Sequence, residues 1–96
     1  MMVLITYDVN TQTAEGQKRL RKVAKACVNY GIRVQNSVFE CVLDGAQFCS
    51  LKAILEEIID DELDSVRFYH LGNNYQKKVE EMGKNNAIHV EEVLLL

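Results

Sequence analysis

The stretch Met2-Val3-Leu4-Ile5-Thr6-Tyr7-Asp8-Val9 decides the fold of this chain, because both of its alternating sets of side chains are largely apolar. This pattern is typical of a central strand in a sheet that is covered on both faces. Asp8 is the first charged side chain in the sequence. A carboxylate at the edge of a core costs free energy unless a partner offsets it, so the partner of Asp8 is the first question about function.

The patterns that follow predict an alternation of helices and strands. Thr11 or Thr13 is expected to cap the first helix, and Gly31 to end it. Gln35-Asn36-Ser37 is expected to be a tight turn between two short strands. The further elements expected before residue 73 are a helix over 14–30, strands over 32–35 and 38–43, a helix over 46–60 and a strand over 66–71.

The predicted order is β-α-β-β-α-β, which is the α+β arrangement called ferredoxin-like or split βαβ. The apolar tail Ala87–Leu96 is expected to add a fifth strand at a sheet edge, because an apolar tail left in water would be a liability. Both helices of this fold pack on one sheet face. Since the strands are apolar on both sides, the open face needs a cover, and a second copy in a two-fold homodimer is the simplest candidate.

Composition indicates a single domain over residues 1–96. The chain is 48% hydrophobic and 26% charged, and no apolar run approaches the roughly 20 residues that span a bilayer. The first residues lack the features of a secretory signal, so we expect a cytoplasmic protein that does not bind membranes. Cys27, Cys41 and Cys49 are interpreted as small buried hydrophobes, with neither a zinc site nor a disulfide framework.

The net charge of −3 is unevenly distributed. Residues 1–33 carry six bases and two acids, a net of +4, whereas residues 34–64 carry one base and eight acids, a net of −7. Four of the bases share one face of the first predicted helix: Lys18, Arg21, Lys22 and Lys25. This face is either the solvated side of an amphipathic helix or a surface for sequence-independent, salt-sensitive contact with phosphates.

Asp8 leaves two interpretations open. It either accepts backbone N–H groups from the turn at Asn10–Thr13, or it is a ligand for a hard divalent cation. One carboxylate holds Mg²⁺ poorly, but a two-fold axis near the strand end would add a second Asp8, and a shared cation would remove the repulsion between them. His70 and His89 have no partners at ligand or triad spacing, and no nucleophilic triad is apparent.

Three sequence features together resemble a known family. They are the strand ending Tyr7-Asp8, the basic helix Lys18-Arg19-Leu20-Arg21-Lys22-Val23 that leads to Tyr30-Gly31, and the run Arg33-Val34-Gln35-Asn36-Ser37-Val38-Phe39-Glu40. Across roughly residues 2–72 they look like the second core CRISPR-associated (Cas) protein family, the small nuclease of the spacer-adaptation module. The part of the chain after Gly72 varies in that family, so residues 73–96 are treated as a variable C-terminal segment expected to pair with a sheet edge in the dimer.

The resemblance implies a homodimer in which two strand-end aspartates hold one Mg²⁺ or Mn²⁺ and hydrolyse phosphodiester bonds of RNA or double-stranded DNA. Asp8 would be the metal ligand and a catalytic residue. The other matched catalytic positions are Tyr7, Arg33, Ser37 and Phe39. The expected nucleic-acid-binding residues are Lys18, Arg19, Arg21, Lys22, Lys25 and Arg33, with Lys22 standing where an arginine is often found.

Two alternatives to the nuclease stay open. The family implies a second role as a non-catalytic DNA-binding dimer that bridges dimers of the CRISPR adaptation integrase. An RNA-cleaving toxin of the same fold is the other alternative, because small toxin nucleases share this architecture.

Overall fold

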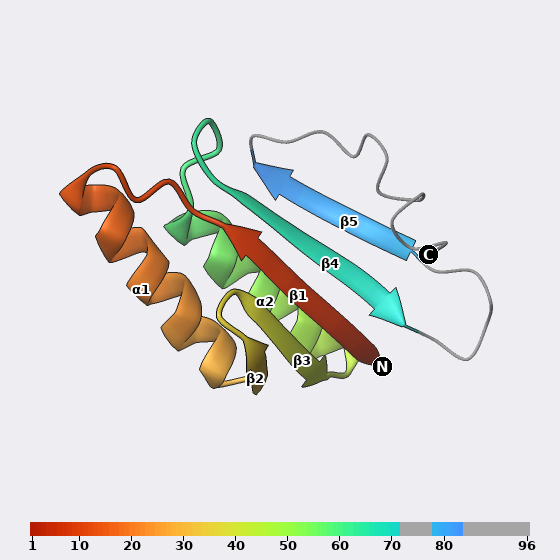
Figure 1. The fold of residues 1–96 in the computed structure, drawn as a ribbon. Helices are drawn as coiled ribbons and strands as arrows, with labels where there is room; N and C mark the ends of the chain where they lie inside the picture. The colour runs from red at the N-terminus through yellow and green to blue at the C-terminus, as the bar shows by residue number, and fades with distance from the viewer. Residues whose placement is uncertain (72–77, 84–96) are drawn as a thin grey trace.

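The computed structural model describes residues 1–71 and 78–83, which form a five-stranded antiparallel sheet with two helices (Figure 1). The strand order is β2-β3-β1-β4-β5, so β1 lies at the centre. The elements are β1 (Met2–Asp8), α1 (Ala14–Val28), β2 (Gly31–Gln35), β3 (Val38–Val42), α2 (Gly45–Ile58), β4 (Ser65–Leu71) and β5 (Lys78–Gly83). The predicted α+β order β-α-β-β-α-β is confirmed. Neither helix is long and apolar enough to cross a bilayer.

Both helices cover the same face of the sheet, and the core lies between them and the strands (Figure 1). Val3, Ile5 and Tyr7 of β1 point into this core, while the alternate residues of the strand are only partly buried or exposed. The helices contribute buried residues that include Val23 and Leu51. We call the sheet face without helices the open face. The predicted uncovered face is therefore present in the single chain.

The fifth strand is not where the sequence analysis expects it. It spans Lys78–Gly83, inside a polar stretch, and pairs with β4 of the same chain. An edge strand needs little apolar surface, because backbone pairing with one neighbour holds it in place. Here Met82 packs against the core, and Glu81 forms an ion pair with Arg67. The strand predicted over Ala87–Leu96 lies outside the described residues.

The ends of α1 resolve one open choice and correct one prediction. Thr13, rather than Thr11, is the N-cap, and its hydroxyl accepts the Gly16 N–H at 3.0 Å. The C-cap is Asn29, so Gly31 does not end the helix as expected but begins β2. A Cβ atom on Gly31 would collide with the Sγ atom of Cys41 and the backbone of β3. Glycine is needed there for close packing, not for a helix cap.

The three cysteines are free thiols with different exposures. Cys27 and Cys41 are buried, as expected, and burial raises the pKa of Cys27 to about 12. Cys49 is exposed, so its interpretation as a buried hydrophobe is wrong. It lies on the solvent side of α2, a placement that helical spacing could have indicated. The two buried thiols serve as packing groups between α1 and β3.

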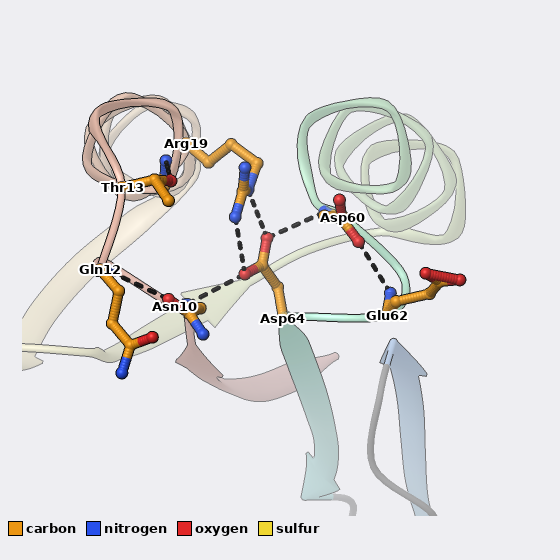
Figure 2. A network of polar contacts seen from close by, with 8 residues as sticks. Asn10, Gln12, Thr13, Arg19, Asp60, Glu62 and Asp64 are labelled. Atoms are coloured by element: carbon orange, nitrogen blue, oxygen red, sulfur yellow. Dashed lines mark hydrogen bonds and ion pairs between the residues drawn. The ribbon is translucent and has the colours of Figure 1, made fainter.

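Asp64 joins three segments at one end of the sheet (Figure 2). Its carboxylate is fully buried and accepts Arg19 Nε at 2.7 Å, the Asn10 N–H at 3.0 Å and the Asp60 N–H at 2.9 Å. These contacts connect the β1–α1 loop, α1 and the loop before β4. Burial alone would raise the pKa of Asp64, but the bonds from Arg19 and from the two backbone amides outweigh it and hold the pKa below its ordinary value.

The Asp64 network predicts a specific loss of stability. Asp64→Asn should lower the free energy of unfolding by about 2 kcal/mol at about pH 7, because hydrogen bonds to a charged group are removed. Since the folded-state pKa is depressed, this contribution is present above about pH 4 and disappears as the pH falls below that value. Urea denaturation at about pH 7 and at a pH below about 4 measures the free energy of unfolding of the parent and of the variant. Asp61→Asn, at an exposed neighbour, is the control. An equal effect of the two variants would refute the role of Asp64.

Candidate functional site

Asp8 lies at the end of β1 on the open face, and its side chain is exposed. In the antiparallel pairing of β1 with β4, Ser65 lies next to Asp8 and Arg67 lies next to Thr6. Together with Tyr7 these residues line an open pocket of about 180 Å³. The pocket holds a carboxylate, a guanidinium and hydroxyl groups at the end of the central strand, where a sheet can present side chains to a ligand.

The open face changes character along β1. Around the start of the strand it is apolar, because Met2 lies between Val42 and Leu71 in the strand register. Val42 is 73% exposed. At the other end of the strand Thr6 and Asp8 face the polar residues of the pocket. The pocket is therefore a polar site at the margin of an apolar surface.

The turn after β1 does not supply hydrogen bonds to Asp8 from two of its amides. The Asn10 N–H donates to Asp64, and the Gln12 N–H donates to the side chain of Asn10 at 3.0 Å (Figure 2). The interpretation that Asp8 accepts backbone N–H groups of this turn is therefore wrong for the amides of Asn10 and Gln12. Asp64 has the structural role that was one alternative for Asp8. Asp8 is left exposed at the pocket, where it can meet a ligand.

The sequence analysis missed three of the residues that line the pocket, Thr6, Ser65 and Arg67, and Arg67 is the charged one. Its Nε atom forms an ion pair with the carboxylate of Glu81 in β5. The Arg67 side chain is 28% exposed, whereas that of Glu81 is 6% exposed. Burial lowers the pKa of Arg67, but the hydrogen bond with Tyr69 and the charge of Glu81 outweigh it, so the pKa lies above its ordinary value. The guanidinium is thus a permanent cation beside Asp8.

Tyr7, Phe39 and Arg33 meet on the opposite face of the sheet. The rings of Tyr7 and Phe39 are stacked with centroids 6.2 Å apart, and the Arg33 guanidinium carbon lies 5.2 Å from the Phe39 centroid. Burial raises the pKa of Tyr7, and its hydrogen bond with Arg33 offsets only part of this rise. Phe39 is fully buried and packs under β1. The catalytic role expected for it stays a prediction, and the contacts that the structure shows for its ring are those with Tyr7 and Arg33.

The turn between β2 and β3 is tied to the end of β1. The Tyr7 N–H donates to the Ser37 carbonyl at 3.1 Å, and the Tyr7 hydroxyl donates to the Asn36 carbonyl at 3.2 Å. The structure therefore brings together Tyr7, Ser37, Arg33 and Phe39, as the sequence predicted. It places the side chains of Tyr7, Phe39 and Arg33 behind the strand end, where Ser37 contributes its backbone carbonyl, whereas Asp8 projects on the open face. The two hydrogen bonds of Tyr7 hold the backbone next to Asp8, and the catalytic role expected for Tyr7 stays a prediction.

The basic side chains of α1 divide into two groups. Lys18, Arg21, Lys22 and Lys25 are exposed, so they are available to phosphates. Arg19 differs, because its guanidinium is held by Asp64 at both Nε and a terminal nitrogen (Figure 2). Its expected contact with nucleic acid stays a prediction, and the contact that the structure shows is internal. Arg19 differs from the other bases of α1 because it binds Asp64, and the sequence pattern of the helix does not reveal this partner.

One chain does not provide a complete metal centre within its described part. In residues 1–71 and 78–83, no three His, Cys, Asp or Glu side chains gather in a way that could hold an ion. Asp8 supplies the carboxylate that lines the pocket. A hard divalent ion prefers oxygen ligands and keeps several waters, so an exposed carboxylate fits half of such a site.

Relatives of known name match nearly the whole chain. The family model described as CRISPR associated protein Cas2 matches residues 1–79. A CRISPR-associated endonuclease Cas2 of Halalkalibacterium halodurans is 60% identical over 95 residues, which are 99% of both chains. A CRISPR-associated endoribonuclease Cas2 of Chlorobaculum tepidum is 52% identical over 96 residues, with 100% coverage of both.

A solved structure agrees with these matches. The crystal structure of Streptococcus pyogenes Cas2 at pH 6.5 is similar with a TM-score of 0.71 and 63% sequence identity. The similarity covers 79% of this chain and 92% of that one. The chain belongs to the CRISPR associated protein Cas2 family.

Proposed function

We propose that this chain is a metal-dependent nuclease that hydrolyses phosphodiester bonds of RNA or double-stranded DNA during CRISPR spacer acquisition. The observation that carries the proposal is the exposed carboxylate of Asp8 at the polar pocket of the open face. Relatives named endonuclease and endoribonuclease support the same reaction class. The toxin alternative gains no support from these relatives.

Asp8 is the residue that would hold Mg²⁺ or Mn²⁺. When bound, the ion would polarise a phosphodiester oxygen and lower the pKa of a water molecule. The residues of the chain orient the carboxylate: pairing of Asp8 with Ser65 fixes the strand end, and Tyr7 ties it to the β2–β3 turn. Arg33 adds positive charge near the strand end from the other face through its hydrogen bond with Tyr7.

A homodimer would complete the site. The apolar part of the open face lacks a helix cover, and a second copy is the partner that buries it without another protein. A two-fold axis near the ends of the two β1 strands would bring two Asp8 carboxylates together. They share an ion only where both reach it at about 2.1 Å, so the two carboxylates must come within about 5 Å of each other.

Asp8→Asn tests the catalytic proposal. The variant should lower the rate of RNA or duplex cleavage in Mg²⁺ by about a hundredfold or more, because removal of a metal ligand takes away several kcal/mol of transition-state stabilisation. Its melting temperature should match that of the parent, since Asp8 is exposed. Glu56→Gln, which removes an exposed carboxylate of α2, is the control and should cleave normally. Undiminished cleavage by Asp8→Asn would rule out Asp8.

The exposed basic face of α1 favours a second role, as an architectural dimer that bridges dimers of the adaptation integrase on DNA. Reversing charge at Lys18, Arg21 and Lys22 should abolish integration by the partner integrase, because attraction to phosphates is replaced by repulsion. A scaffold that needs no catalysis should integrate normally with Asp8→Asn. Lys52→Glu, on α2, is the charge control. Full integration by the triple variant would exclude the face as a DNA-binding surface.

The dimer is tested by a charge on the open face. Val42→Lys places a charge at an exposed position of the apolar surface and should shift the sedimentation profile from dimer to monomer, with loss of cleavage. Val28→Lys is the matched control, because Val28 is 58% exposed but lies on α1. It should remain dimeric. If Val42→Lys also sediments as a dimer, the copies do not meet through this face.

A further inference from the structure

We propose that Ser65 and Arg67 form a phosphate-binding subsite beside Asp8, in which Glu81 orients the guanidinium toward the nucleic-acid backbone. The inference rests on the proposed nuclease function and extends it by assigning two further substrate-binding residues. Both residues lie on β4, and both line the pocket that contains Asp8.

The strand register places the two residues where a bound phosphodiester would pass. Ser65 lies directly across from Asp8, and Arg67 lies across from Thr6, one step further along the same face. Residues two apart on a strand point to the same side, so the hydroxyl and the guanidinium flank one short surface. A phosphate whose scissile bond is near Asp8 would lie within reach of both.

The size of the pocket indicates a small anionic group. Its volume of about 180 Å³ is below the roughly 300 Å³ at which pockets for drug-sized molecules begin. A phosphate can enter this open pocket. The chemistry of the walls agrees, because serine and arginine side chains are both common donors to phosphate oxygens.

Glu81 makes Arg67 a directed donor. It holds the Nε side of the guanidinium from β5, at a position paired with Arg67 in the sheet. Glu81 is the more deeply buried partner, so the exposed part of the pair is the guanidinium. Arginine has five N–H donors in a fixed fork that matches two phosphate oxygens, and the ion pair with Glu81 and the hydrogen bond with Tyr69 involve only some of them.

Charge favours the same assignment. A phosphate near Asp8 is repelled by its carboxylate unless a cation is close. Arg67 supplies that cation permanently, because its pKa lies above the ordinary value. The ion pair with Glu81 prevents an excess of positive charge on the open face when nucleic acid is absent, so the subsite adds recognition without a large uncompensated charge.

The test measures binding without cleavage, so that it does not depend on the catalytic role of Asp8. In an Asp8→Asn background, fluorescence anisotropy gives the affinity for duplex DNA and, in a second arm, for single-stranded RNA over a series of salt concentrations. Arg67→Gln alone leaves the buried Glu81 unpaired and risks misfolding. The variant therefore combines Arg67→Gln with Glu81→Gln. Arg67→Lys and Lys52→Gln are the comparison variants.

We expect the logarithm of the binding constant to fall less steeply with the logarithm of the salt concentration in the double variant Arg67→Gln/Glu81→Gln. We call this steepness the salt slope. The slope should fall by about 0.9 for each duplex phosphate that Arg67 neutralises, and by about 0.7 for each phosphate of a single strand. Arg67→Lys should keep the slope, and Lys52→Gln should not change it. Ser65→Ala should weaken binding about fivefold with an unchanged slope, because serine carries no charge. The arm with the larger change identifies DNA or RNA as the substrate of the subsite.

Three results would overturn the subsite. The first is an unchanged slope when both charges are removed. The second is an equal loss of affinity in Arg67→Lys and Arg67→Gln/Glu81→Gln, which would indicate a structural role. The third is dissociation of the dimer by Arg67→Lys, which would place Arg67 in the interface between copies. With Asp8 intact, the double variant Arg67→Gln/Glu81→Gln should have a KM about tenfold higher and an unchanged kcat. Loss of the subsite together with normal Asp8 chemistry would leave the proposed nuclease function standing.

Discussion

Backbone pairing of β1 on both of its edges is the constraint on which the rest of the structure depends. The strand bonds to β3 on one side and to β4 on the other, over nearly its whole length. In a strand bonded in this way, successive side chains must point to opposite faces of the sheet. Tyr7 is therefore directed to the helices and Asp8 to the open face. Burial of one residue and exposure of its neighbour are two results of one backbone geometry.

The Asp64 network complements this constraint at the end of β1. The loop after the strand must turn back into α1, and its Asn10 amide would be left without a partner near the core if no acceptor stood there. Asp64 accepts that amide, the Asp60 amide and Arg19 at once. This arrangement separates two acids with different roles. Asp64 is buried and bonded to stabilise the fold, whereas Asp8 remains open to a ligand.

Most of the fold was predictable because strong local patterns coincide with the tertiary structure. The apolar alternation of β1, the helical spacing of Leu51 and Leu55, and the turn at residues 35–37 each predicted their elements to within about two residues. β5 was not predicted, because an edge strand is selected by pairing with β4 and not by its own hydrophobicity. The structure also differs from the prediction that Gly31 ends the first helix, because the close packing of Gly31 against Cys41 involves another strand.

By itself the sequence determined the order of elements, the uncovered apolar face and the position of Asp8 at a strand end, because these follow from periodicity along one segment. The resemblance of the Tyr7-Asp8 strand end and the Arg33–Glu40 run to a known family identified residues that gather near that end. Only the tertiary structure decided which face of the sheet each of these residues occupies. It also decided that Arg19 binds Asp64 and that Ser65 and Arg67 line the same pocket as Asp8. Those facts depend on contacts between segments far apart in the chain, and no local pattern encodes those contacts.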